Sequence, residues 1–115
     1  MQIERYLHKN ISKLLLQFPA VLVLGARQVG KTTLCREVTK DWTTIDLESH
    51  ADYQRLERDP EHFLRLHPSR LLIDEAQISS GLFPALRVAI DEHRDQPGRF
   101  LLTGSSSPQL LKHTS

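Results

Sequence analysis

Apolar residues follow two different spacings along the chain, which together predict alternating helices and strands. A helical spacing over residues 2–17, ended by Pro19, predicts an amphipathic N-terminal helix. Short apolar runs over 20–24, 70–74 and 99–103, and an alternating β-branched run over 42–47, predict four strands. Further helices are predicted near 31–40, 50–58, 60–66, 82–94 and 108–111.

The order of these elements favours an α/β fold. A helix followed by alternating strands and helices predicts a mostly parallel sheet of about four strands, with right-handed crossovers and three layers. At 115 residues the chain is long enough for at most one compact domain. We therefore expect one domain over 1–115, in which an N-terminal helix (1–18) precedes a core (19–115).

One segment between the first predicted strand and the next helix has the pattern of a phosphate-binding loop. It reads Gly25-Ala26-Arg27-Gln28-Val29-Gly30-Lys31-Thr32. Glycines let the backbone pass close to phosphate oxygens, and N–H groups over 28–33 can converge on an anion. The pattern predicts that Lys31 reaches the β- and γ-phosphates, that Thr32 ligates Mg²⁺, and that Thr33 lies towards the α-phosphate. The alternative is a glycine-rich turn with a solvated lysine. The nucleotide-binding residues expected here are Gly25, Gln28, Val29, Gly30, Lys31, Thr32 and Thr33.

Two carboxylates follow the third predicted strand. Asp74 is expected to hold Mg²⁺ through water, and Glu75 to orient and deprotonate an attacking water. The alternative is a strand-terminal acidic turn. No Asn-Lys-x-Asp motif for reading guanine occurs in the chain, which favours ATP over GTP. At the second strand end, Asp46 and Glu48 are interpreted as solvated acids.

Hydroxyl residues gather at the end of the fourth predicted strand. Thr103 or Ser105 could reach a γ-phosphate or the attacking water. Ser107 precedes Pro108 and more plausibly caps the helix that is predicted to follow.

Composition limits the other classes of function. The net charge is +1 with interspersed charges, so nothing directly indicates nucleic-acid binding. Cys35 is the single cysteine and is interpreted as a small buried side chain in a reducing compartment. No apolar run approaches the roughly 20 residues of a membrane span, and the six histidines show no metal-binding spacing. A cytoplasmic location is expected.

Several stretches together resemble a prokaryotic AAA-like ATPase family. They are Val23-Leu24-Gly25-Ala26-Arg27-Gln28-Val29-Gly30-Lys31-Thr32, Leu72-Ile73-Asp74-Glu75-x-Gln77 and Gly98-Arg99-Phe100-Leu101-Leu102-Thr103-Gly104-Ser105. The chain looks like the N-terminal ATP-binding module of proteins that also carry an uncharacterised C-terminal domain. The resemblance implies that Lys31 and Thr32 bind phosphate and Mg²⁺, that Asp74 completes the metal site, that Glu75 is the catalytic acid, and that 103–105 is the sensor region.

The resemblance also implies parts that cannot be recognised in this sequence. Such ATPases have a five-stranded sheet in which the phosphate-loop strand lies between the fifth and the sensor strand. Only four strands are recognisable here, so the core is expected to be incomplete at its C-terminus and the phosphate-loop strand to lie at an exposed edge. Self-association, or a partner supplying an arginine and an edge strand, is then expected. Two functions stay open: a Mg²⁺-dependent ATP hydrolase, and a nucleotide-binding module with negligible turnover.

Overall fold

The computed structural model describes residues 2–25 and 30–105, with side chains from residue 5 onwards. The elements, in chain order, are α1 (Gln2–Gln17), β1 (Ala20–Gly25), α2 (Lys31–Val38), β2 (Thr43–Asp46), α3 (His50–Arg58), α4 (Pro60–Leu66), β3 (Leu71–Asp74), the 3-10 helix η1 (Ala76–Ile78), α5 (Leu82–Glu92) and β4 (Phe100–Ser105). The predicted bounds are confirmed to within two residues at each end, and η1 was not predicted. The helix predicted at 108–111, with its cap Ser107, lies outside the described residues.

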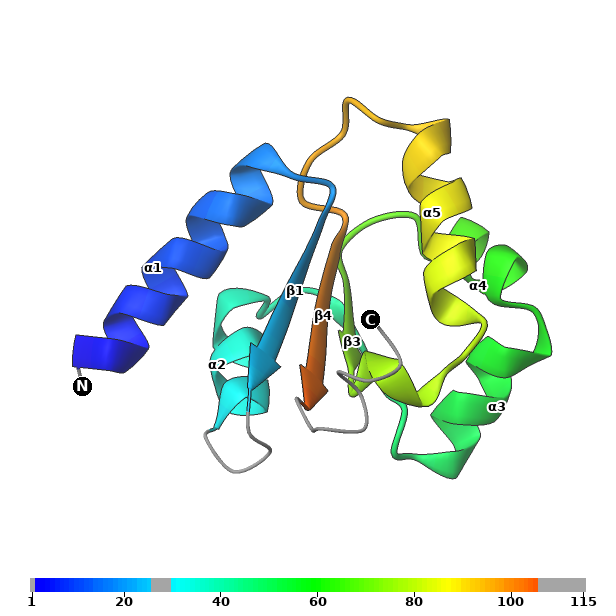
Figure 1. The fold of residues 1–115 in the computed structure, drawn as a ribbon, viewed down its shortest axis with the longest axis horizontal. Helices are drawn as coiled ribbons and strands as arrows, with labels where there is room; N and C mark the ends of the chain where they lie inside the picture. Colours follow the sequence, from blue (N-terminus) through cyan, green and yellow to red (C-terminus); the bar gives the residue numbers. More distant parts are fainter. Residues whose placement is uncertain (1, 26–29, 106–115) are drawn as a thin grey trace, which may run out of the picture.

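The four described strands form one parallel sheet in the order β1-β4-β3-β2. In Figure 1 the labelled strands run in the same direction, and α2 begins beside the end of β1. Parallel strands bring all their carboxyl ends to one edge of the sheet. Here that edge carries Gly25, Asp46, Asp74 and Ser105.

Helices cover both faces of the sheet, which gives three layers. In Figure 1, α1 and α2 lie on one side of the sheet, and α3, α4 and α5 on the other. Side chains alternate along a strand between the two faces. In β4, Leu101 packs with the α1 and α2 side, whereas Phe100 and Leu102 pack with the α5 side. The α/β class and a core like that of phosphate-loop nucleoside triphosphatases are confirmed.

Arg99 fixes the start of β4 against its neighbours. The residue is 3% exposed, and its guanidinium donates to the carbonyls of Pro68 and Ala89, at 2.7 Å each. Burial lowers the pKa of Arg99, with a smaller opposing effect from the charge of Glu92. This arginine therefore ties the turn before β3 and the end of α5 to the sheet.

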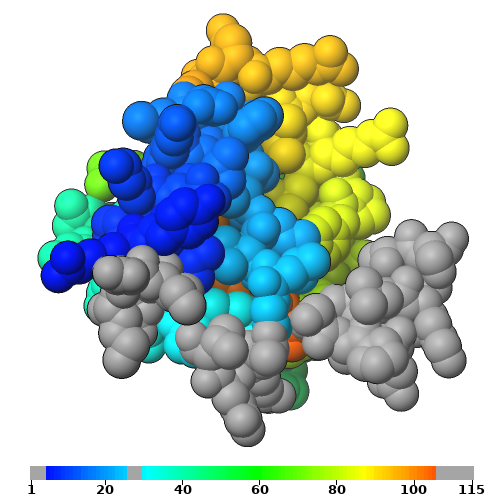
Figure 2. All heavy atoms as spheres, turned by 60° about the vertical axis from the view of Figure 1, so that its left-hand side comes forward, coloured from blue at the N-terminus to red at the C-terminus, as the bar shows by residue number. Residues whose placement is uncertain are grey.

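β1 forms one edge of the described sheet, with β4 as its neighbour. Figure 2 shows β1 at the surface between α1 and α5. Its Leu22 and Leu24 side chains are 45% and 52% exposed, an unusual state for leucines on the strand that leads to a phosphate-binding loop. The expectation that this strand lies at the sheet edge is confirmed for the described residues.

Candidate functional site

The backbone at Gly30 sets the start of α2. Gly30 has φ 72° and ψ 21°, a left-handed conformation that glycine adopts without steric cost. Helix α2 then begins at Lys31, so its first N–H groups and the Lys31 side chain lie at the carboxyl edge of the sheet. A helix N-terminus at this edge attracts anions through its unpaired N–H groups and its dipole.

Asp74 connects the two predicted motifs. The Thr32 hydroxyl donates to Asp74 Oδ1 at 3.0 Å, and the Thr103 hydroxyl donates to the same oxygen. Thr103 is fully buried, and its hydroxyl oxygen accepts from the Glu75 backbone N–H at 2.9 Å. A threonine hydroxyl beside a carboxylate is a set of oxygen donors suited to a hard divalent cation such as Mg²⁺.

Glu75 lies immediately after β3 in a strained backbone conformation. Its φ of 57° and ψ of 53° are left-handed, which is uncommon for a residue other than glycine and occurs disproportionately at functional sites. The turn at Glu75 leads directly into η1. The chain therefore leaves the sheet sharply at Glu75, the acidic residue that is predicted to deprotonate the attacking water.

The Glu75 carboxylate is surrounded by polar groups from three elements. Its Oε1 accepts from Ser105 Oγ and from Gln77 Nε2, at 2.8 Å each. Its Oε2 lies 3.7 Å from Lys31 Nζ, which also donates to Ser105 Oγ at 3.5 Å. Lys31 and Glu75 are each 4% exposed, so their charges face each other with little screening by water.

A further carboxylate, that of Asp46, lies at this edge of the sheet. Asp46 is level with Asp74 in the register of β2 and β3, and it is partly buried. Burial raises the pKa of Asp46, and the negative charges of Asp74 and Asp52 raise it further. Asp46 is thus less solvated than the strand-end acid that was expected, whereas Glu48 is exposed as expected. Two parallel strands that both end in aspartate could have signalled this proximity.

The remaining predicted residues fall into three groups. Gly25 ends β1 level with Ser105, and Thr33 is exposed on α2. Gln28 and Val29 lie outside the described residues. Cys35 is fully buried, as predicted. Burial, followed by the charge of Asp74, raises the pKa of its thiol to about 11, against the opposing effect of Lys31.

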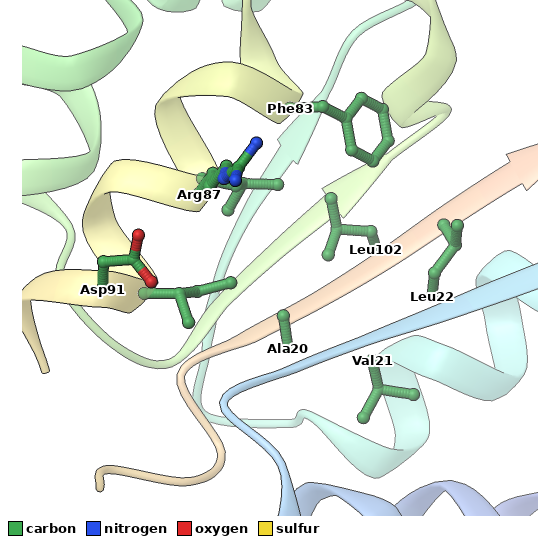
Figure 3. Close-up of a pocket in the computed structure, with 9 residues that line it drawn as sticks. Ala20, Val21, Leu22, Phe83, Arg87, Asp91 and Leu102 are labelled. Atoms are coloured by element: carbon green, nitrogen blue, oxygen red, sulfur yellow. The ribbon is translucent and has the colours of Figure 1, made fainter. Parts of the chain in front are cut away.

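A separate hollow of about 320 Å³ lies beside the edge strand. Figure 3 shows Leu22 and Leu102 of the sheet facing Phe83 and Arg87 of α5 across it. Lys31, Asp74 and Glu75 do not line this hollow. The apolar groove and the polar strand-end site are therefore two distinct features.

The described part of the chain contains no group of three or more His, Cys, Asp or Glu residues placed to hold a metal ion. Helices within the same described ranges are too short or too polar to cross a membrane.

Residues 17–115 match the family described as AAA domain. The chain belongs to this AAA domain family. Two curated relatives are the uncharacterized protein Rv2008c of Mycobacterium tuberculosis and the uncharacterized protein Mb2031c of Mycobacterium bovis. Each is 46% identical over 95 residues, which make up 81% of this chain and 21% of the relative. No solved structure matches the chain significantly.

Membership of the AAA domain family indicates the general class of function to which the site belongs. The chain is an AAA-like module of the ATPase type, and the family indicates nucleotide binding in general. The chain spans about a fifth of the length of the curated relatives it matches, at 21%.

Proposed function

We propose that this AAA module binds Mg²⁺-ATP at the carboxyl edge of its sheet and hydrolyses it there. The observation that carries the proposal is the contact between Thr32 and Asp74, which lie 42 residues apart in two separate motifs and meet at 3.0 Å. Lys31 and Glu75 flank this contact. A phosphate-binding lysine, a hydroxyl, a metal-binding carboxylate and a candidate base thus occupy one site.

The residues divide the work according to their chemistry. Lys31 would hold the β- and γ-phosphates, and backbone N–H groups at the start of α2 would donate to the phosphate oxygens. Thr32 would ligate Mg²⁺ directly and Asp74 through water. The bound cation would neutralise charge on the phosphate oxygens. Ser105 lies where it could contact the γ-phosphate.

Glu75 would act as the general base. A water oxygen forms a bond to the γ-phosphorus while the bond from that phosphorus to the bridging oxygen breaks. The water proton passes to the Glu75 carboxylate, and ADP and inorganic phosphate are released.

The second candidate is a nucleotide-binding module with negligible turnover, and the positions of the arginines favour it. Arg36 and Arg87 are exposed, and Arg99 is held by two backbone carbonyls. Within residues 2–25 and 30–105, Lys31 is a cation that contacts the Glu75 carboxylate, at 3.7 Å. Loss of a charge-stabilising arginine slows related enzymes by about 10³ to 10⁵. We propose that a partner or a second copy of the chain supplies this arginine when turnover is needed.

Calorimetric titration of ATP, with and without Mg²⁺, tests the metal site. Mg²⁺ should tighten ATP binding by the intact chain, and Asp74→Asn should remove most of this increment. Asp41→Asn, which alters an aspartate with an 87% exposed side chain, is the matched control. An unchanged Mg²⁺ increment in Asp74→Asn would contradict the proposed metal site.

Phosphate release separates the two candidate functions. If the intact chain releases phosphate faster than Glu75→Gln, the hydrolase is supported. Equal background rates together with tight binding would favour the binding module. Competition by GTP in the same assay tests the proposed preference for adenine.

A further inference from the structure

Gln77 is a residue of η1 to which the proposed mechanism gives no role. Its Nε2 donates to Glu75 Oε1 at 2.8 Å. Its Oε1 is buried and has no hydrogen-bond partner among the described residues. Burial of an amide oxygen without a partner is unfavourable, and an apolar side chain would avoid that cost. The hydrogen bond that this amide makes within the described residues is to the candidate base.

The position of the Gln77 amide depends on a glycine in the neighbouring strand. A Cβ atom at Gly104 would lie 3.2 Å from Gln77 Oε1 and 2.9 Å from Leu24 Cδ2. The absence of a side chain at this position therefore leaves room for the amide against β4. The next residue, Ser105, also donates to Glu75 Oε1. The end of β4 thus supports the Glu75 carboxylate directly through Ser105 and indirectly through Gln77.

The orientation of the amide follows from its partner. A carboxylate oxygen only accepts hydrogen bonds, so the nitrogen of Gln77 must face Glu75 and its oxygen must face Gly104. The reverse orientation would place two acceptor oxygens against each other. Gln77 consequently donates to Glu75 Oε1 through its nitrogen.

Three groups of the described part of the chain, Lys31, Gln77 and Ser105, contact the Glu75 carboxylate and differ in what nucleotide binding would do to them. Lys31 contacts Oε2, and the phosphates of a nucleotide would compete for its charge. Gln77 and Ser105 both contact Oε1 and carry no charge that phosphate would attract. They can therefore hold one carboxylate oxygen while Lys31 leaves the other.

We infer that Gln77 is a positioning residue that holds the Glu75 carboxylate in place, so that Oε2 faces the attacking water once Lys31 has moved to the phosphates. This inference rests on the proposed function. It goes further, because it states that an uncharged amide in η1, that of Gln77, holds the base Glu75 in its orientation. Gln77 acts through Glu75 and does not itself touch the reacting atoms.

Two variants of Gln77 distinguish a role of its amide in positioning Glu75 from a role of its side chain in filling space. Gln77→Met keeps nearly the same volume and flexibility but removes the donor, whereas Gln77→Ala removes both. Both should lower kcat for ATP hydrolysis by about ten- to a hundredfold, the order expected when a reacting group is misplaced by about 1 Å. The affinity for Mg²⁺-ATP should stay within about twofold, because the phosphate contacts remain. Gln54→Met, at an exposed glutamine on α3, is the matched control.

Hydrogen exchange of the Gln77 side-chain amide tests its contact with Glu75 without any hydrolysis of ATP. In the nuclear magnetic resonance spectrum of the full chain, hydrogen exchange of the Gln77 side-chain amide should be at least about tenfold slower than that of Gln54. Glu75→Ala should remove this protection, and addition of a non-hydrolysable ATP analogue to the intact chain should preserve it.

The outcomes are distinct. A protected Gln77 amide, together with equal losses of kcat in Gln77→Met and Gln77→Ala, supports the inference. Recovery of kcat in Gln77→Met, or an amide that exchanges as fast as that of Gln54, overturns it. If the intact chain hydrolyses no faster than Glu75→Gln, hydrolysis as the proposed function fails. The amide exchange then decides the role of Gln77 by itself.

Discussion

Replacement of Glu75 by glutamine should tighten the binding of Mg²⁺-ATP as well as remove turnover. Lys31 Nζ lies 3.7 Å from Glu75 Oε2 in a buried contact. Nucleotide phosphates must draw the ammonium away from this carboxylate. Glu75→Gln keeps the shape of the side chain and an oxygen that can accept from Ser105 and Gln77, but removes the charge that competes for Lys31.

The separation of the two charges sets the size of the effect. Two unit charges 3.7 Å apart attract each other by about 4.5 kcal/mol at an effective dielectric constant of about 20. Much of this is offset, because Lys31 keeps its contact with Ser105 and the variant amide still presents a dipole. If about a third remains, the gain is roughly 1.5 kcal/mol, which corresponds to about tenfold tighter binding.

Isothermal titration with a non-hydrolysable ATP analogue and Mg²⁺ measures this gain without interference from hydrolysis. The control is Glu37→Gln, which makes the same change in net charge at an exposed position on α2. The control should change the affinity by less than about twofold, since exposed charges are screened by salt. Equal or weaker binding by Glu75→Gln would refute the view that Glu75 competes with phosphate for Lys31.

Three further outcomes follow from the structure. Gly30→Ala should destabilise the chain by about 1 kcal/mol in thermal unfolding, because alanine is strained at φ 72° although nothing lies within 4 Å of the added Cβ. Cys35 should react with a thiol reagent at pH 8 at least about a hundredfold more slowly in the folded chain than in denaturant, and faster as the pH rises, because its pKa is raised to about 11. Asp46→Asn should raise the unfolding temperature by about 2 °C at pH 7, because a carboxyl whose pKa is raised by folding costs stability when ionised. This gain should vanish by roughly pH 3, where Asp46 is protonated in both states.

The periodicity of the sequence was sufficient to predict the fold. The buried runs that became β3 and β4 and the amphipathic spacing of α1 were recognisable, because burial of one helix face or a whole strand leaves a regular pattern. The pairing of Thr32 with Asp74 could also be anticipated from two motifs at parallel strand ends. The edge position of β1 followed from the resemblance and agrees with the sheet order.

Interactions that depend on the register between distant strands could not be predicted in the same way. The closeness of Asp46 to Asp74 arises from the alignment of β2 with β3. The contact of Gln77 with Glu75 arises from the left-handed turn at Glu75 and the missing side chain at Gly104. The Gln77 contact has no local sequence pattern and therefore required coordinates, whereas the proximity of Asp46 and Asp74 had one signal in the sequence, two strands that both end in aspartate.

A partner strand is still expected to pair with the exposed edge of β1. Leu22 and Leu24 are about half exposed, and Leu22 lines the groove shown in Figure 3. Exposed strand edges with apolar side chains tend to pair with further strands. A strand supplied by a second copy or another segment stays a prediction, as does the cytoplasmic location.

The central claim is that the phosphates of a nucleotide bind at the start of α2. Titration of Mg²⁺-ATP into the intact chain, Lys31→Ala and Lys40→Ala tests it most directly. Lys40 lies beyond the end of the same helix and is exposed, so its loss controls for a change of one positive charge. We expect Lys31→Ala to lower the affinity by at least about a hundredfold, the loss of a charge-assisted contact of roughly 3 kcal/mol, while Lys40→Ala binds as the intact chain does. Equal affinities for Lys31→Ala and the intact chain would contradict it.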